Sequence, residues 1–167
     1  MACHPEYGRS KEAGEQKLRD TLPAHYIVRT SWVHGVEGNN FAKTMLGLAR
    51  DNDTVTVVDD QFGSPTFTFD LALAIRQLVT SGRYGTYHLT NSGSCSWFDL
   101  ARRVFAVAGV DCVVTPTDTA TFGALAPRPL YSVLDNLVAR HTGLTPLPPW
   151  EESLEKLIAE LGAGPSR

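Results

Sequence analysis

Two side chains near the start of the chain have types and spacing that suit proton transfer. Tyr7 and Lys11 are four residues apart, and residues at i and i+4 lie one turn apart on the same face of a helix. A phenol can give a proton to a carbonyl oxygen that becomes an alcohol, but its unperturbed pKa is about 10. A neighbouring ammonium favours the phenolate. The pair therefore predicts general-acid chemistry, with a chance YxxxK on a solvated helix as the alternative.

The residues that follow bring this pair close to a predicted strand end. Helix formers fill residues 8–22, and a β-branched and aromatic run over 25–33 predicts a buried strand. That strand ends in Arg29, Thr30, Ser31 and Trp32. Because ligands of open α/β sheets bind at the carboxyl ends of strands, these polar and aromatic residues favour a binding site there.

Strand-like and helix-like segments alternate along the rest of the chain. Further strands are predicted at 54–58, 85–90 and 110–115. Further helices are predicted at 41–48, 69–80, 96–108 and 150–161. Ser96 and Asp99 have the spacing of a capping box, and Gly109 is expected to end their helix. The alternation predicts an α/β fold, with one end of a parallel sheet and an appended α/β lobe.

Composition excludes several functional classes. The 167 residues are 43% hydrophobic and carry a net charge of -3. A chain with this charge has no overall positive field that would attract nucleic acid or an anionic membrane. No apolar run approaches the roughly 20 residues of a membrane span. Cys3, Cys95 and Cys112 are scattered and form no zinc-ligand spacing with the histidines, so we expect no metal site and a reduced, cytoplasmic setting.

Seven blocks resemble one enzyme family, dTDP-4-dehydrorhamnose reductase, an extended short-chain dehydrogenase/reductase. They occur in the family's order and cover residues 5–161. The blocks are YGRSKEAGE at 7–15, RTSWVHG at 29–35, NNF at 39–41, VDDQFGSPT at 58–66, GTYHLTN at 85–91, APRP at 126–129 and SVLDN at 132–136. One departure is His34, where the family usually has tyrosine, and this affects a detail of the pocket wall.

The resemblance implies a reaction and a cofactor. It implies reduction of the 4-keto group of dTDP-4-dehydro-L-rhamnose to dTDP-L-rhamnose by NADPH or NADH. Tyr7 would protonate O4 as hydride arrives at C4. Lys11 would lower the pKa of Tyr7, and both residues would contact the nicotinamide ribose.

The resemblance also implies substrate contacts, each with a structural alternative. Trp32 and Ser31 would lie against the sugar nucleotide, and Asn40, Gln61 and Arg128 would line the substrate lobe. Large aromatics at strand ends usually pack in the core, which is the alternative for Trp32. Asn40 could simply begin a helix, and Arg128 could be a surface arginine.

The resemblance implies a division of the chain into two parts and a match to one half of the family's sequence. Residues 1–66 are expected to end a Rossmann-like domain and carry the YxxxK helix. Residues 67–161 are expected to form mainly the substrate-binding lobe and closing helices, and residues 162–167 a flexible tail. The sequence contains no glycine-rich GxGxxG turn for a cofactor diphosphate. We therefore expect the C-terminal half of the reductase, with a second chain or a homo-oligomer covering an open sheet edge.

Two other functions remain open at this point. A non-catalytic sugar-nucleotide-binding or regulatory module of the short-chain reductase family fits the missing glycine-rich turn. Another sugar-nucleotide enzyme, an epimerase or dehydratase, would share the YxxxK pair. The RTSW and DQFGSPT blocks favour the reductase over these.

Overall fold

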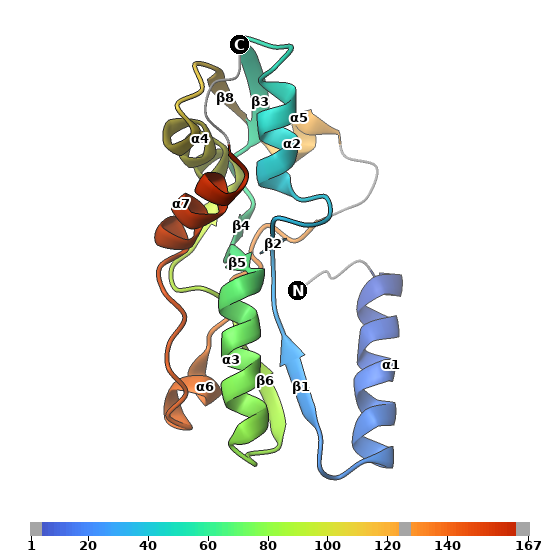
Figure 1. Cartoon of the computed structure of the whole chain (residues 1–167). Coiled ribbons are helices and arrows are strands. Elements are labelled where there is room, and N and C mark those ends of the chain that lie inside the picture. Colours follow the sequence, from blue (N-terminus) through green and yellow to red (C-terminus); the bar gives the residue numbers. More distant parts are fainter. Residues whose placement is uncertain (1–4, 124–127, 163–167) are drawn as a thin grey trace.

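Short strands alternate with helices through the computed structural model, which describes residues 5–123 and 128–162 (Figure 1). In chain order the elements are α1 (Pro5–Thr21), β1 (Tyr26–Arg29), β2 (Val33–His34), α2 (Phe41–Leu48), β3 (Thr54–Val58), β4 (Phe62–Gly63), β5 (Thr66–Phe67), α3 (Thr68–Thr80), β6 (Gly85–His88), β7 (Cys95–Ser96), α4 (Trp97–Ala108), β8 (Val113–Thr117), α5 (Thr119–Phe122), α6 (Leu137–His141) and α7 (Trp150–Glu160).

The strands form small sheets of two strands each. Three pairs are parallel, β1 with β6, β2 with β5 and β3 with β8, and one pair, β4 with β7, is antiparallel. Parallel pairs need crossover connections, and helices supply most of them here. The predicted α/β class, with a parallel sheet, is therefore confirmed.

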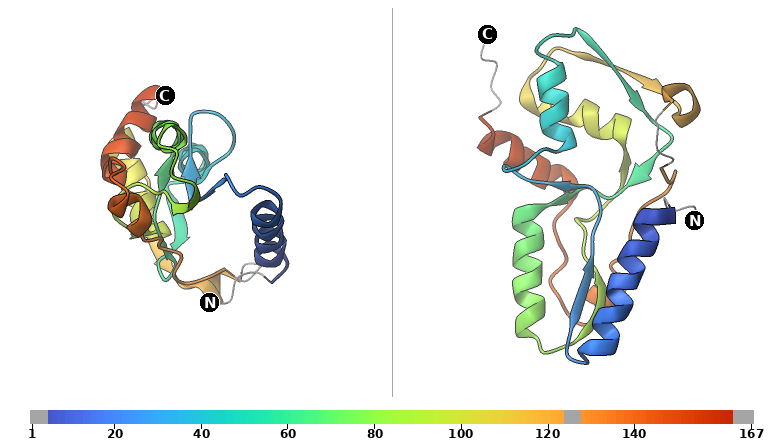
Figure 2. Two further views of the ribbon diagram at one scale, coloured as in Figure 1. Left: turned by 90° about the horizontal axis from the view of Figure 1, so that it is seen from below. Right: turned by 90° about the vertical axis from the view of Figure 1, so that its right-hand side faces the viewer.

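Two apolar clusters form the cores of the two ends of the molecule. At one end α3 and α6 pack on β1 and β6, around Leu78, Tyr87 and Leu89. At the other end α2, α4 and α7 pack together over β3, around Leu100, Val104 and Leu154. Figures 1 and 2 show these groups as separate ends, connected through β2, β4 and β5. The connecting segments are therefore where residues from both ends can meet.

Helix α1 stands apart from the other helices in Figure 1 and in the left view of Figure 2. Tyr26 and Val28 pack toward the cluster that contains α3. Strand residues alternate between faces, so Ile27 and Arg29 face the opposite side, where α1 runs. Ile27 is buried there, and Leu18 of α1 is half-buried. Helix α1 thus lies against the face of β1 that α3 leaves uncovered.

Several local predictions are confirmed and two are wrong. Ser96 and Asp99 form the capping box of α4, and Gly109 ends that helix in the left-handed conformation. The strand predicted over 25–33 is two strands, because Trp32 has a φ of 46° and interrupts the extended backbone. The strand predicted over 110–115 begins at residue 113, because the Val110 N–H still bonds the Phe105 carbonyl of α4.

The predicted division of the chain at residue 66 stays a prediction, and residues 163–167 of the predicted tail lie outside the described residues.

A buried polar network connects the loop after β6 to α3 and α7. The Asn91 Nδ2 donates to Asp70 Oδ2 at 2.8 Å and to the Pro148 carbonyl at 3.1 Å. Its Oδ1 accepts from the Phe67 N–H at 3.0 Å, and Ser153 Oγ donates to Asp70 Oδ2 at 2.5 Å. Asn91 and Asp70 are buried, so these bonds replace water that the groups have lost. Asn91 therefore joins segments that are far apart in the sequence, the start of α3 and the segment before α7.

We expect Asn91→Ala to lower the free energy of unfolding by about 2–4 kcal/mol, because it leaves the Phe67 N–H without its acceptor and removes one of the two hydrogen bonds to the buried Asp70 carboxylate. Urea unfolding followed by circular dichroism measures this. Asn39→Ala, at an exposed asparagine, is the control and should change stability by less than about 0.5 kcal/mol. Equal, small effects of both variants would contradict the role given to Asn91.

Candidate functional site

Tyr7 and Lys11 lie on one exposed face of α1, as the spacing predicts. The Lys11 Nζ is 5.3 Å from the centroid of the Tyr7 ring. The Tyr7 residue is 63% exposed, so its phenol can be reached by a ligand. The ammonium thus lies over the face of the aromatic ring, within the range of a cation–π contact. The structure brings the predicted pair together, and its role in catalysis stays a prediction.

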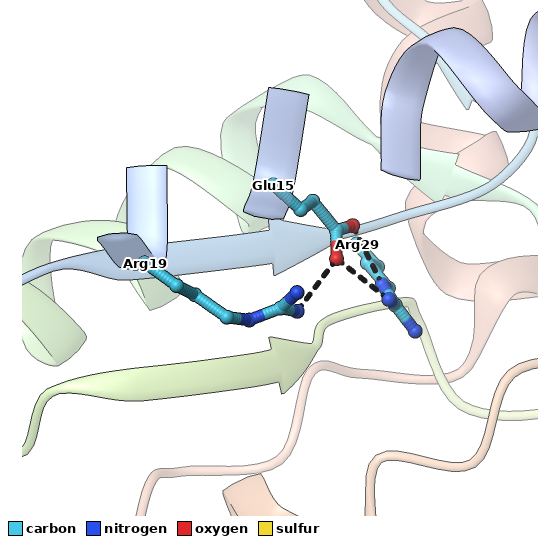
Figure 3. Close-up of polar contacts among 3 residues, drawn as sticks. All are labelled: Glu15, Arg19 and Arg29. Carbon is cyan, nitrogen blue, oxygen red and sulfur yellow. Dashed lines mark hydrogen bonds and ion pairs between the residues drawn. The ribbon is translucent and has the colours of Figure 1, made fainter. Parts of the chain in front are cut away.

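An ion pair connects this face of α1 to the end of β1 (Figure 3). Arg29 donates to Glu15 through two bonds, Nε to Oε1 at 2.8 Å and Nη2 to Oε2 at 2.6 Å. Arg19 of α1 also donates to Oε2 at 2.8 Å. The bonds from Arg29 are the main reason that the pKa of Glu15 is lowered and the pKa of Arg29 is raised. Both side chains therefore stay charged near neutral pH.

Trp32 is held in a strained conformation at the junction between β1 and β2. Its φ of 46° is in the left-handed region, which costs a residue with a bulky side chain about 1–3 kcal/mol. Its ring stacks on Trp97 with centroids 3.5 Å apart and planes at 9°. A Cβ added to Gly63 would lie 2.2 Å from the Trp32 ring. The stacking partner and the glycine together fix the position of the indole.

The carbonyl of Trp32 is also fixed. It accepts hydrogen bonds from the Thr66 N–H at 3.0 Å and from His34 Nδ1 at 2.6 Å. Because a carbonyl only accepts, Nδ1 carries the proton. The Nε2 of His34 is then an acceptor, and it is buried without a partner among the residues that the structure describes. Burial lowers the pKa of His34 to about 4. The histidine is neutral at pH 7, and its ring lies 5.6 Å from that of Phe67.

Ser31 and Gln61, two further predicted substrate residues, use their side chains in hydrogen bonds within the protein. Ser31 Oγ donates to the Ser64 carbonyl at 2.8 Å, beside Gly63. Gln61 is 4% exposed, and its Nε2 donates to Thr119 Oγ1 at 3.0 Å. Ser31 and Trp32 therefore meet the segment that contains residues 61–66. Their contact with a substrate stays a prediction.

Asn40 lies at the start of α2, and Arg128 lies between α5 and α6. Asn40 caps α2: its Oδ1 accepts from the Lys43 N–H and its Nδ2 donates to the Gly35 carbonyl. These bonds agree with the helix-entry alternative, and a substrate contact of Asn40 stays a prediction. Arg128 is exposed. Residues 126–127 of its sequence block lie outside the described residues.

Two partners in the site were missed from the sequence. Trp97 covers one face of Trp32, but it follows a capping serine and carries no motif of its own. Glu15 lies four residues after Lys11 and eight after Tyr7, so helical spacing could have placed it on the same face. Its partner Arg29 could not be identified without the fold.

The cysteines and helices of the described residues were also compared with what metal binding and membrane insertion require. Cys95 and Cys112 are buried, and burial raises the pKa of both thiols. Within residues 5–123 and 128–162, no three His, Cys, Asp or Glu side chains gather as metal ligands would. Over the same residues, no helix has the length and apolar character that crossing a membrane requires.

Comparison with known proteins identifies relatives over nearly the whole chain. The RmlD substrate binding domain family matches residues 3–163. A dTDP-4-dehydrorhamnose reductase of Streptomyces griseus is 43% identical over 93% of this chain and 53% of its own length. A dTDP-4-keto-6-deoxy-D-glucose reductase of Streptomyces niveus is 43% identical over 96% of this chain and 56% of its own length. The chain thus spans about half the length of these curated relatives.

A solved structure agrees with the fold. The dTDP-4-dehydrorhamnose reductase of Bacillus anthracis, in complex with NADP, superposes with a TM-score of 0.87 at 44% sequence identity. The match covers 92% of this chain and 54% of that one.

We expect the stability of the protein to fall between pH 7 and pH 5 because of His34. Its folded pKa of about 4 is below the unfolded value of about 6.5, so the unfolded chain binds the proton first. Stability is therefore full above about pH 6.5 and falls as the pH drops toward 4, with a loss of about 2 kcal/mol at pH 5.

The measurement is urea unfolding of the wild type and of His34→Gln at both pH values. The variant should lose about 2 kcal/mol less between pH 7 and pH 5 than the wild type. His141→Gln, at an exposed histidine, should behave like the wild type. A wild-type loss no greater than that of His34→Gln would contradict the assignment.

We expect Gly63→Ala to displace the Trp32 ring from Trp97, because the added Cβ occupies the position of the indole. The near-ultraviolet circular dichroism of the stacked indoles should change, and stability should fall by about 1–3 kcal/mol. Gly47→Ala is the control, since a Cβ at Gly47 meets nothing within 4 Å. An unchanged indole spectrum in Gly63→Ala would show that Gly63 does not position Trp32.

Proposed function

The chain belongs to the RmlD substrate binding domain family, and from this premise we propose that it takes part in reduction of a dTDP-4-keto sugar. The proposed reaction converts dTDP-4-dehydro-L-rhamnose to dTDP-L-rhamnose with NADPH or NADH. The observation that carries this proposal is the exposed Tyr7 phenol with the Lys11 ammonium beside it, 5.3 Å from the ring centroid. The family match supports the substrate class, and the exposed position of Tyr7 beside Lys11 supports its role as proton donor.

In the proposed mechanism this chain provides the proton. A reduced nicotinamide cofactor, when bound, supplies hydride for C4 of the sugar. Tyr7 donates its phenolic proton to O4 as that oxygen gains negative charge, and a new O–H bond replaces the phenol O–H bond. The Lys11 ammonium stabilises the phenolate that remains. A positioned acid of this kind contributes about 10²–10⁴-fold to the rate.

Lys11 and Tyr7 also fit a role in holding the cofactor. Both side chains are exposed on one face of α1, so a ribose hydroxyl can approach them. The Lys11 ammonium has three donors that can serve a ribose hydroxyl. The NADP complex of the Bacillus anthracis relative supports a nicotinamide cofactor.

The substrate is proposed to bind against the strained aromatic at the end of β1. Trp32 would offer its indole to the sugar nucleotide, with Ser31 beside it. Asn40, Gln61 and Arg128 would line the surrounding lobe, Arg128 through charge attraction to the diphosphate. The rigid support of Trp32 by Trp97 and Gly63 is consistent with this use, because a fixed aromatic face costs little entropy on binding.

We propose that a second chain supplies the missing part of the cofactor site, or that the chain forms a homo-oligomer through its open sheet edge. The sequence has no glycine-rich turn of the kind that accepts a diphosphate. Strand β1 pairs with β6 on one side, and its other edge has no partner strand among the described residues. An open edge is a template for another strand. The proposed setting is the cytoplasm, because its reducing conditions keep thiols such as those of Cys95 and Cys112 free.

The alternative function is a sugar-nucleotide-binding or regulatory module without catalysis. The missing glycine-rich turn favours it, and the exposed Tyr7–Lys11 pair argues against it. An epimerase or dehydratase is the other alternative. Structures of such enzymes resemble this chain at under 20% identity, which supports the shared fold alone.

The decisive experiment follows NADPH oxidation with dTDP-4-dehydro-L-rhamnose. We expect turnover when the chain is combined with the dinucleotide-binding half of a related reductase. Tyr7→Phe should lower kcat by about 10²–10⁴-fold. Tyr84→Phe, at an exposed tyrosine that contacts Tyr26, is the matched control and should retain full activity.

Three results would decide against the proposal. No turnover in the complemented sample would overturn the reductase, and full turnover with Tyr7→Phe would overturn the role of Tyr7. Binding of the dTDP-sugar by calorimetry, without turnover under any condition, would establish the binding module instead.

A further inference from the structure

Helix α1 has few connections to the rest of the molecule. Its residues are mostly exposed, and Figures 1 and 2 show it set off from the other helices. The loop over residues 22–25 connects its C-terminal end to β1. Among the described residues, the side-chain hydrogen bonds between α1 and another element are the two from Arg29 to Glu15. The direction of α1 therefore depends strongly on this pair.

Glu15 lies on the same stripe of α1 as the proposed catalytic pair. Tyr7, Lys11, Glu15 and Arg19 follow one another at intervals of four residues, and each interval turns the position by only about 40° around the helix. Glu15 is two steps from Tyr7, about 12 Å along the axis. An anchor at Glu15 therefore fixes both the rotation of the helix and the face that presents Tyr7.

The geometry of the pair is suited to an anchor. Both oxygens of Glu15 are held by Arg29 at 2.8 and 2.6 Å, and Arg19 holds one of them from the same helix (Figure 3). A two-bond contact restricts orientation as well as distance. The side chain of Glu15 is 17% exposed, which limits competition from water, whereas that of Arg29 is 48% exposed.

Arg29 also leads directly into the proposed substrate-binding segment. It is the last residue of β1, and Ser31 and Trp32 follow after one residue. The pair thus joins the helix with the proton donor to the strand with the proposed sugar platform. Movement of α1 against β1 would change the distance between these two parts of the site.

We infer that Glu15 is a positioning residue, which acts through Arg29 to hold Tyr7 and Lys11 in register with the end of β1. This inference rests on the proposed function. It predicts that loss of the pair lowers the rate of the chemical step more than it weakens substrate binding, because a misplaced proton donor affects the transition state.

The first test needs neither substrate nor cofactor. Hydrogen exchange of the whole chain, followed by mass spectrometry of peptides from residues 5–21, should be about fivefold faster in Glu15→Gln than in the wild type. Asp20→Asn is the matched control, since it removes the same charge from the same helix, and among the described residues the Asp20 side chain accepts a hydrogen bond from Gln16 of α1 alone. Equal exchange in Glu15→Gln and wild type would overturn the anchor.

The second test uses the complemented enzyme with NADPH and dTDP-4-dehydro-L-rhamnose. We expect Glu15→Gln and Arg29→Lys to lower kcat about tenfold, with KM changed by less than about twofold. The exchanged pair Glu15→Arg with Arg29→Glu should recover part of the kcat, and Asp20→Asn should be unaffected. The inference would be overturned if kcat fell only in variants whose melting temperature also fell, and if the exchanged pair recovered neither. Glu15 would then be a stabilising residue without a positioning role.

The two tests separate the inference from the proposed function. Absence of turnover in the unmodified assembly overturns the proposed function. The exchange measurement decides the anchor independently of that result.

Discussion

The contact between Glu15 and Arg29 is the polar interaction on which the arrangement of the site depends. A helix such as α1, with a mainly polar surface, gains little from burial, so its direction is set by few contacts. The ion pair supplies direction because both oxygens of one carboxylate are bound by one guanidinium. It joins the element that carries Tyr7 and Lys11 to the strand that continues toward Trp32.

The second constraint is the strained backbone at Trp32. A left-handed tryptophan persists only when its surroundings stabilise it by more than the strain costs. Here the carbonyl accepts two hydrogen bonds, and the indole lies between Trp97 and Gly63. Trp32 also lies between β1 and β2, so the strain interrupts the extended backbone where one strand ends and the next begins. Strain at such a position is typical of a functional site.

The sequence predicted the α/β class, most helices and the Tyr7–Lys11 face, because these follow from local spacing and from ordered motifs. Ser96, Asp99 and Gly109 show this well, since capping depends on residues close in sequence. The break at Trp32 could not be predicted, because the strain is stabilised by Trp97 and Gly63, which are distant in sequence. The partner of Glu15 was hidden for the same reason: Arg29 is 14 residues away and belongs to a different element.

A crystal structure of the complemented assembly with dTDP-L-rhamnose would show whether Tyr7 is placed to donate the proton. We expect the Tyr7 Oη within about 3.2 Å of the sugar O4, the distance of a hydrogen bond ready for proton transfer. We also expect the sugar to lie between Tyr7 and Trp32. A bound sugar whose O4 is hydrogen-bonded to another group, with Tyr7 turned away into solvent, would rule out Tyr7 as the proton donor.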